Sequence, residues 1–372
     1  MSQALSLKPT VFAVGNTYQI LIPVSLPTLM WVKVGEKLYH DDAGGVLRSS
    51  VSVHRVTVPA EALDRAREYT VCYREMLCRK PYFSETGESV EERFSFRPVG
   101  DFPLRAYHIA DAHGMVDAPV ASARAFEKRY GPLNFLILNG DVIDHSGDIR
   151  HFSAIYEIAW QITGGEIPVV FARGNHDTRG ACAEKLTDYT PTDYGKPYFS
   201  FRLGPIWGVI LDCGEDKDDS HPEYGFTNCC HHFRLRETDF LKELILRKGD
   251  EYEDGGVRCR LVVVHNPFTR RYEPPFNIEE SLFSEWAALL RENIHPDLMI
   301  CGHLHTLSLS MPGSSADALG QPCPVWVGAA PNRKQKTFTG SGFVFSADHT
   351  LIVANRGDEV IETHRLPYGN TD

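Results

Sequence analysis

The chain has 372 residues, of which 42% are hydrophobic and 23% are charged, and its formal net charge is −11 at pH 7. This composition is typical of a globular protein, and the acidic charge argues against non-specific binding to nucleic acid or to membrane surfaces. No apolar run approaches the roughly 18 residues of a membrane-spanning helix. A chain of this length predicts two domains.

The first hundred residues predict a small all-β sandwich domain of the fibronectin III or immunoglobulin type. Segments rich in β-branched and aromatic residues are expected to form strands at residues 11–24, 30–38, 51–58, 69–77 and 93–98. Tyr69 is either a corner residue that bonds back to the preceding turn or a half-buried strand residue. Residues 97–103, with two prolines and a glycine, form the predicted linker, so the domains are residues 1–100 and 101–372.

After the linker, strands and helices alternate, which predicts an α/β domain with largely buried, partly parallel strands. Strands are expected at residues 104–110, 134–138, 168–172, 261–264 and 298–301, with a hairpin at 199–211 and further strands after residue 325. Helices are expected at residues 118–130, 147–163, 236–248 and 278–293.

Five polar segments follow predicted strands of this second domain. They are Asp111-Ala112-His113, Gly140-Asp141-Val142-Ile143-Asp144, Gly174-Asn175-His176-Asp177, the single His265, and Gly302-His303-Leu304-His305. Each is weak evidence alone, and an isolated His265 is more often a core histidine. Because ligands bind beyond the carboxyl ends of strands in α/β sheets, the five segments together predict one site. Its Asp, Asn and His side chains suit two divalent cations that share a bridging carboxylate.

In this order the five segments resemble the full signature of the calcineurin-like metallophosphoesterase superfamily, over residues 104 to about 310. The resemblance implies a four-layer α/β/β/α metallophosphoesterase sandwich, preceded here by the small all-β sandwich domain. It also implies two metal ions with Asp141 as the bridging ligand. The first ion would be held by Asp111, His113, Asp141 and His305, and the second by Asp141, Asn175, His265 and His303.

The same resemblance assigns roles to two further residues of these segments. His176 would be the general acid that protonates the leaving oxygen, and Asp144 would orient His176 through a hydrogen bond. Two adjacent cations can acidify a shared water and clamp a phosphoryl oxygen, so a metal-bridging hydroxide is the expected nucleophile. Nitrogen and oxygen ligands fit Mn, Fe, Zn or Co, and the ligands alone do not choose among these metals.

Two departures separate the chain from better-known branches of the superfamily. The serine/threonine protein phosphatases carry an Arg where this chain has His145, which disfavours that branch. Purple acid phosphatases have Tyr at the position of Asp144 and Gly at the position of His113, so a purple Fe(III)-tyrosinate centre is not expected. A β-sandwich ahead of the phosphoesterase domain nevertheless loosely resembles the domain order of purple acid phosphatases.

Substrate contacts are less constrained by the motifs. His145 is expected to touch the substrate. One or two of the arginines near the predicted ligands would bind the phosphate or the leaving group, and Arg179 is the main candidate. The other arginines near ligands are Arg173, Arg270 and Arg271. Residues 229–232 are expected to be an insertion loop rather than another metal site, and the acidic residues 216–220 a solvated loop.

The leading function is a metal-dependent phosphomonoesterase or phosphodiesterase acting on a small phosphorylated metabolite or nucleotide. A nuclease is disfavoured by the acidic charge. A non-catalytic scaffold is disfavoured because all seven ligand positions and His176 are present. Nine cysteines without regular spacing, and an N-terminus unlike a signal peptide, predict a cytoplasmic protein with reduced thiols. Self-association through the N-terminal domain is also left open, and no membrane or nucleic-acid partner is expected.

Overall fold

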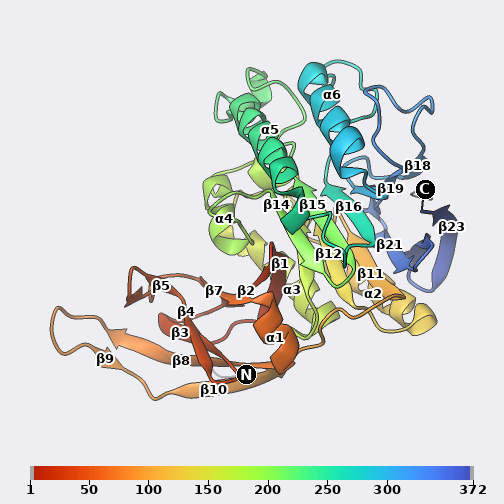
Figure 1. Cartoon of the computed structure of the whole chain (residues 1–372). Helices are drawn as coiled ribbons and strands as arrows, with labels where there is room; N and C mark the ends of the chain where they lie inside the picture. Colours follow the sequence, from red (N-terminus) through yellow and green to blue (C-terminus); the bar gives the residue numbers. More distant parts are fainter. Residues whose placement is uncertain (1–3, 369–372) are drawn as a thin grey trace.

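The computed structural model describes residues 4–368, and two large β-sheets lie at its centre (Figure 1). From one edge to the other, the first sheet consists of β23 (Glu359–Pro367), β22 (His349–Arg356), β21 (Thr337–Phe345), β11 (Leu104–Ile109), β12 (Phe135–Asn139), β13 (Val169–Ala172), β1 (Thr10–Val14), β2 (Thr17–Pro23) and β7 (Val53–Pro59), with β20 (Ala330–Asn332) paired to β21. The second sheet consists of β14 (Phe199–Leu203), β15 (Ile206–Leu211), β16 (Cys259–Val264), β17 (Leu298–Cys301), β19 (Val325–Gly328) and β18 (Leu307–Ser310).

Helices cover the outer faces of both sheets. The first sheet is covered by α2 (Asp117–Tyr130) and α3 (Ser153–Thr163), and the second by α5 (Cys230–Leu246) and α6 (Glu280–Leu289). The shorter helical segments are α1 (Ala60–Ala66), α4 (Leu186–Tyr189), η1 (Ile149–Phe152), η2 (His176–Thr178), η3 (Ala183–Lys185), η4 (Pro222–Tyr224), η5 (Lys248–Asp250) and the π-helical η6 (Leu290–Ile294). Within residues 4–368, no helix has the length and apolar character needed to cross a membrane.

The alternation of side chains along the central strands produces four layers. In β12, Ile137 packs between the two sheets, whereas Leu136 packs against α2 and α3. In β16, Val263 packs between the sheets, whereas Val262 packs against α5 and α6. Strands buried on both faces have nearly continuous apolar sequences. The central strands could therefore be predicted from the sequence. The α/β/β/α sandwich predicted from the sequence is confirmed, together with an N-terminal all-β part.

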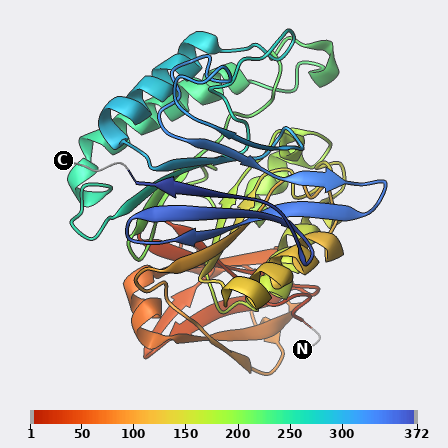
Figure 2. The same ribbon diagram turned by 90° about the vertical axis from the view of Figure 1, so that its right-hand side faces the viewer.

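The N-terminal residues build a third sheet next to this sandwich. It contains β10 (Val90–Ser95), β8 (Glu68–Cys78), β3 (Thr28–Val34) and β4 (Lys37–His40), with β9 (Glu85–Thr86) paired to β8, and β5 (Asp42–Ala43) and β6 (Val46–Leu47) form a small separate hairpin. In both views this third sheet lies at one end of the molecule and α5 and α6 lie at the other (Figure 1 and Figure 2).

The N-terminal strands are not confined to the third sheet. Strand β1 runs parallel to β13, with Phe12 opposite Val169, and β2 and β7 extend the first sheet beyond β1. The first sheet is therefore continuous across the linker at residues 97–103. Strand spacing in a sequence reveals that strands exist but not which sheet they join, so this continuity was not foreseen. The division into domains at residue 100 stays a prediction.

Tyr69 connects the two parts of the chain. Its side chain is 1% exposed, and its hydroxyl donates a hydrogen bond of 2.9 Å to the carbonyl oxygen of Gly165, in the turn between α3 and β13. Both interpretations of Tyr69 from the sequence were wrong, because the residue is fully buried and its partner lies 96 residues away. Gly165 has φ +77°, and a Cβ there would lie 2.8 Å from Pro9 O and 3.0 Å from the Tyr69 hydroxyl.

Helix α5 begins at Cys230, six residues before the predicted start at residue 236. The reason is a cap from outside the local sequence: the carboxylate of Asp219 accepts hydrogen bonds from the backbone N–H groups of Cys230 and His231. The prediction of a loop at residues 229–232 was therefore wrong for the last three of them. The same contact gives Asp219 a structural role within the acidic segment 216–220.

We expect Tyr69→Phe to lower the free energy of unfolding by about 1–2 kcal/mol, because the buried carbonyl of Gly165 loses its donor. The matched control is Tyr73→Phe on the same strand, since the buried Tyr73 hydroxyl has no hydrogen-bond partner among residues 4–368. Urea denaturation followed by circular dichroism measures both. Equal midpoints for the two variants would show that the Tyr69 hydrogen bond does not stabilise the fold.

Candidate metal centre

All seven predicted ligands lie just beyond the carboxyl ends of strands in the first and second sheets. Asp111 and His113 follow β11, Asp141 follows β12, Asn175 follows β13, His265 follows β16, and His303 and His305 follow β17. The strands β11, β12 and β13 are parallel to one another, as are β16 and β17, so each group of ends meets at one edge. Because the two sheets stack, both edges contribute to one cluster.

The backbone of this cluster is strained. Five of the seven predicted ligands have φ between 46° and 71°, namely Asp111, His113, Asp141, His303 and His305. Left-handed backbone is unfavourable for residues other than glycine and concentrates at functional sites. Close packing accompanies the strain: a Cβ on Gly174 would lie 2.2 Å from Asp141 Oδ1, so a side chain at residue 174 is excluded.

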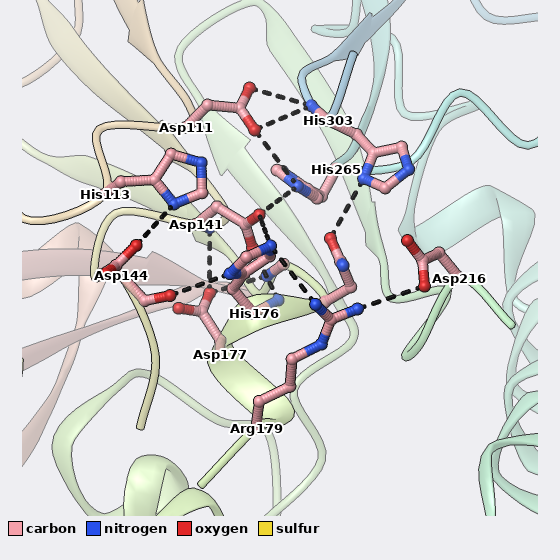
Figure 3. Close-up of polar contacts among 12 residues, drawn as sticks. Asp111, His113, Asp141, Asp144, His176, Asp177, Arg179, Asp216, His265 and His303 are labelled. Carbon is pink, nitrogen blue, oxygen red and sulfur yellow. Dashed lines mark hydrogen bonds and ion pairs between the residues drawn. The ribbon is translucent and has the colours of Figure 1, made fainter. Parts of the chain in front are cut away.

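The side chains of this cluster point toward one another (Figure 3). His265 Nε2 lies 3.3 Å from Asp141 Oδ2 and 3.6 Å from Asp111 Oδ1. His305 Nε2 lies 3.4 Å from Asp111 Oδ1 and 2.9 Å from His113 Nε2. Both carboxylates are therefore shared among several imidazoles, an arrangement that suits bridging ligands.

A contact of Asn175 adds an amide to the carboxylates and imidazoles of the cluster. Asn175 Oδ1 lies 3.1 Å from His303 Nδ1. Three groups of side chains within the described part of the chain have ligand atoms within 4.8 Å of one another: Asp111, His113 and His305; His113, Asp141 and His176; Asp111, Asp141 and His265. The structure thus brings the predicted ligands together, and their assignment to a first and a second ion stays a prediction.

The electrostatics of the cluster favour a bound cation. Burial alone would lower the pKa of His265, but the carboxylates of Asp141 and Asp111 raise that pKa to about 10. The Nδ1–H of His265 donates a 2.7 Å hydrogen bond to Asn139 O, which turns Nε2 toward the carboxylates. This Nε2 atom is buried beside the two carboxylates, 3.3 Å from Asp141 Oδ2 and 3.6 Å from Asp111 Oδ1. Burial lowers the pKa of His113 and of His303 to about 4, so both imidazoles are neutral at pH 7. These residues fit metal ions of the kind the sequence predicts.

His176 lies at the edge of the cluster, with its side chain 32% exposed. Its backbone N–H donates to Asp141 Oδ1 at 2.9 Å, and its Nδ1–H donates to the backbone carbonyl of Asp144 at 2.9 Å. The predicted contact between Asp144 and His176 exists, but through the backbone rather than the carboxylate. The Asp144 carboxylate instead lies 3.6 Å from His113 Nδ1 and 3.0 Å from Arg333 Nη1.

The two predicted substrate contacts differ in their surroundings. His145 is exposed, its Nδ1 accepts from Gly147 N–H, and its ring packs against His151, outside the cluster. Arg179 forms a two-pronged ion pair with Glu215 at 2.8–3.1 Å and lies 3.4 Å from His176 Nε2. Arg179 therefore belongs to the wall of the site, with its charge already balanced.

Sequence reasoning missed three acidic residues that support this site. Asp177 is buried and accepts hydrogen bonds from the backbone N–H groups of Gly174 and Asp141, and burial together with the charge of Asp141 raises its pKa to about 7. Its place in the same motif as Asn175 was an available signal. Glu215 and Asp216 pair with Arg179, and nothing local in the sequence indicated this. The prediction of a solvated loop at residues 216–220 was wrong for Asp216 and Lys217, whose side chains are each 11% exposed.

Two stacked sheets with carboxylate, amide and imidazole side chains gathered at their strand ends form a site that could hold metal ions. A family model described as calcineurin-like phosphoesterase matches residues 104–307. This chain belongs to the calcineurin-like phosphoesterase family, which confirms the enzyme class predicted from the sequence, a metal-dependent phosphoric ester hydrolase.

Solved structures similar to this chain were also found. Purple acid phosphatase PPD1 from yellow lupin (Lupinus luteus) aligns over 96% of this chain and 74% of that chain, with 12% identity and a TM-score of 0.60. A predicted phosphoesterase from Streptococcus pneumoniae TIGR4 (11% identity, 71% of this chain, 97% of that chain) and vacuolar protein sorting 29 from Cryptosporidium parvum (9%, 72% and 100%) both give TM-scores of 0.34. No curated protein sequence matches the chain. The lupin structure supports the fold, including its N-terminal part.

We expect Mn²⁺ to raise the melting temperature of the wild-type protein, because a ligand that binds only the folded state stabilises it by about 2.7 kcal/mol at 100 times its Kd. Asp141→Asn should lose most of this shift, since Asp141 lies at the centre of the cluster. His232→Ala, on the exposed surface of α5, is the control and should retain it. Differential scanning fluorimetry after EDTA treatment makes the comparison, and an equal shift in all three proteins would place metal binding elsewhere.

Proposed function

We propose that this chain is a two-metal phosphoesterase that hydrolyses a phosphomonoester or phosphodiester of a small metabolite or nucleotide. The observation that carries the proposal is the pair of buried carboxylates, Asp111 and Asp141, each within 3.6 Å of at least one imidazole at the same edge of the stacked sheets. A cluster with this charge and this donor set suits two cations. The family to which the chain belongs supports the same reaction class.

The ligands divide between two positions. Asp111, His113, Asp141 and His305 would hold one ion, and Asp141, Asn175, His265 and His303 the other, with Mn, Fe, Zn or Co as the candidate metals. When bound, such a pair of cations acidifies a shared water to a hydroxide nucleophile and offsets charge on the phosphoryl oxygens. Since His113 and Asp144 stand where purple acid phosphatases have Gly and Tyr, a purple tyrosinate centre is not proposed.

His176 is the proposed general acid. The hydrogen bond from its Nδ1 to Asp144 O leaves Nε2 facing the cluster, 4.0 Å from Asp141 Oδ2 and 3.4 Å from Arg179 Nη1, a contact that a leaving oxygen would replace. Its ring is 32% exposed, whereas the side chains of His265 and His113 are 1–2% exposed. His305 is 47% exposed but is assigned to the first ion, so His176 is the solvent-accessible imidazole that the proposal leaves free for acid catalysis. An imidazole in this position can donate a proton to the leaving oxygen near neutral pH.

Two alternatives from the sequence receive less support. A nuclease would need a basic groove for the backbone of nucleic acid, and the chain carries a net charge of −11. A non-catalytic scaffold has no need for a strained, buried ligand cluster, which lowers the stability of the fold.

We also propose that the protein is cytoplasmic, since all nine cysteines are free thiols. Self-association of two copies of this chain through the N-terminal domain is also part of the proposal.

We expect metal-dependent hydrolysis of p-nitrophenyl phosphate, bis-(p-nitrophenyl) phosphate or both after reconstitution with Mn²⁺, Fe²⁺, Zn²⁺ or Co²⁺. Asp141→Asn and His303→Ala should lower kcat/KM to the background, because each removes a ligand. Asp148→Asn, a surface carboxylate that pairs with Arg150, is the control. Inactivity of the wild type with every metal and substrate would support the scaffold instead.

His176→Ala should lower kcat by about 100-fold or more for a substrate whose leaving alkoxide needs a proton, such as an alkyl phosphate. The loss should be much smaller for p-nitrophenyl phosphate, because p-nitrophenolate leaves without protonation. Steady-state kinetics on both substrates, with metal content measured by mass spectrometry, tests this. An equal loss on the two substrates would assign His176 to metal or substrate binding rather than to acid catalysis.

A further inference from the structure

The Asp144 carboxylate lies between a predicted metal ligand and an arginine from a distant part of the chain. Its Oδ1 atom lies 3.6 Å from His113 Nδ1 and 3.0 Å from Arg333 Nη1, and its Oδ2 atom accepts from Arg333 Nη2 at 3.1 Å. In Figure 3 a dashed line joins the His113 ring to this carboxylate. Arg333 lies 189 residues after Asp144, outside residues 104–307 that the family model matches. The five motifs therefore do not account for this contact.

A tight hairpin brings Arg333 to the metal centre. Strands β20 and β21 pair with each other, and residues 333–336 form the turn between them. Asn332 closes this turn, because its Oδ1 accepts from the Gln335 N–H and its Nδ2 donates to Gln335 Oε1, both at 3.0 Å. Strand β21 runs antiparallel to β11, so β21 begins beside the end of β11 that leads to His113. The turn therefore presents Arg333 at the same sheet edge as the ligands.

The pair between Arg333 and Asp144 uses both carboxylate oxygens. A guanidinium that meets a carboxylate with two N–H groups fixes the plane of the carboxylate as well as its distance. The oxygen in contact with Nη1 is Oδ1, which is also the oxygen beside His113. Within residues 4–368, Arg333 has no other acidic partner. Because the two side chains are 58% and 35% exposed, the pair adds little to the stability of the fold, and its main effect is on orientation.

His113 is the residue that this orientation affects. Its side chain is 2% exposed, and its buried Nδ1 makes no hydrogen bond to any of residues 4–368. Its Nε2 lies 2.9 Å from His305 Nε2 and so faces the cluster. An imidazole that binds a metal usually donates its other N–H to a carboxylate or a carbonyl, which fixes the orientation of the ring. His265 has such a partner in Asn139 O, and the group in place to serve His113 is the Asp144 carboxylate.

We propose that Arg333 is a positioning residue of the metal centre, which holds the Asp144 carboxylate against His113 and so raises the affinity for the ion assigned to His113. The inference rests on the ligand sets of the proposed function and adds to them a residue from outside the motifs. The backbone carbonyl of Asp144 also accepts from His176 Nδ1, so Asp144 contacts both a ligand and the proposed acid.

Isothermal titration of the EDTA-treated protein with Mn²⁺ tests this proposal. His113→Ala identifies the binding step to which His113 contributes. Arg333→Ala should weaken the same step about 10-fold, since the loss of an outer partner of a ligand costs roughly 10–100-fold in metal affinity. Arg333→Lys should recover part of the affinity, because a single ammonium replaces the two-pronged contact. An unchanged affinity in Arg333→Ala overturns the proposal.

Lys334 provides the matched control for these measurements. It is the next residue of the same turn, it is exposed, and it forms no ion pair within residues 4–368. Lys334→Ala should therefore bind Mn²⁺ like the wild type. Without metal, the melting temperatures of Arg333→Ala and Lys334→Ala should agree. A large drop in Arg333→Ala alone would mean that Arg333 supports the fold in general, which contradicts the proposal.

A double-mutant cycle shows whether Arg333 acts through Asp144. Asp144→Asn should weaken the step that His113→Ala identifies, because the amide oxygen is a poorer acceptor than a carboxylate. Adding Arg333→Ala to Asp144→Asn should then cause no further loss, since the two residues act as one unit. Additive losses in Mn²⁺ affinity would show that Arg333 acts by another route, and the proposal would be wrong.

Hydrolysis of p-nitrophenyl phosphate and its diester separates this proposal from the proposed function. The activity lost in Arg333→Ala should return when the Mn²⁺ concentration is raised about 10-fold, in line with the weaker binding. A raised KM for the substrate at saturating Mn²⁺ would instead assign Arg333 to substrate binding and overturn the proposal. Arg333-dependent Mn²⁺ binding without hydrolysis would keep the positioning role and refute the phosphoesterase. Hydrolysis with Mn²⁺ binding that is independent of Arg333 would keep the phosphoesterase and refute the positioning role.

Discussion

The burial of two carboxylates sets the conditions for the whole site. Asp111 and Asp141 are 0% and 1% exposed, and removing a charged carboxylate from water is costly unless hydrogen bonds and opposite charges replace the solvent. The motifs supply part of this replacement through their backbone. The N–H of His303 donates to Asp111 Oδ2 at 2.9 Å, and the N–H of His176 donates to Asp141 Oδ1 at 2.9 Å. Each motif thus stabilises a carboxylate that belongs to another motif, which explains why a strained backbone persists at five of the ligand positions.

Hydrogen bonds next to the motifs also connect the two stacked sheets. Asn139, at the end of β12, donates from Nδ2 to Ile300 O on β17 at 3.0 Å and to Val264 O on β16 at 3.3 Å. Its own carbonyl accepts from His265 Nδ1. A residue that is not itself a ligand therefore fixes the separation of the sheets and the orientation of a ligand at once. Because the ligands come from both sheets, the distances within the cluster depend on this contact as much as on the ligands themselves.

The features that could be predicted from the sequence are those that arise from local or periodic residue patterns. Buried strands appear as apolar runs, and ligands at strand ends follow from the geometry of parallel sheets, so the central strands and the position of all seven candidate ligands were foreseen. Contacts between distant residues leave no such pattern. The hydrogen bond from Tyr69 to Gly165, the cap that Asp219 places on α5, and the pairing of Arg179 with Glu215 each join segments through the fold alone. The exposure of His145, away from the cluster, is a further example.

The N-terminal strands are connected to the site through β13, which pairs with β1. This strand ends three residues before Asn175, and its two neighbours are β12 on one side and β1 on the other. Beyond β1, Gln19 on β2 exchanges two hydrogen bonds with the backbone of Thr192, and Arg55 on β7 donates to Thr190 O at 2.6 Å. These contacts fasten residues 187–192, which follow the Gly174 to Asp177 motif in the chain. Without the first sixty residues, β13 would be an edge strand with unpaired backbone groups beside a ligand. The N-terminal part therefore supports the candidate metal centre, and is not only a domain placed ahead of it.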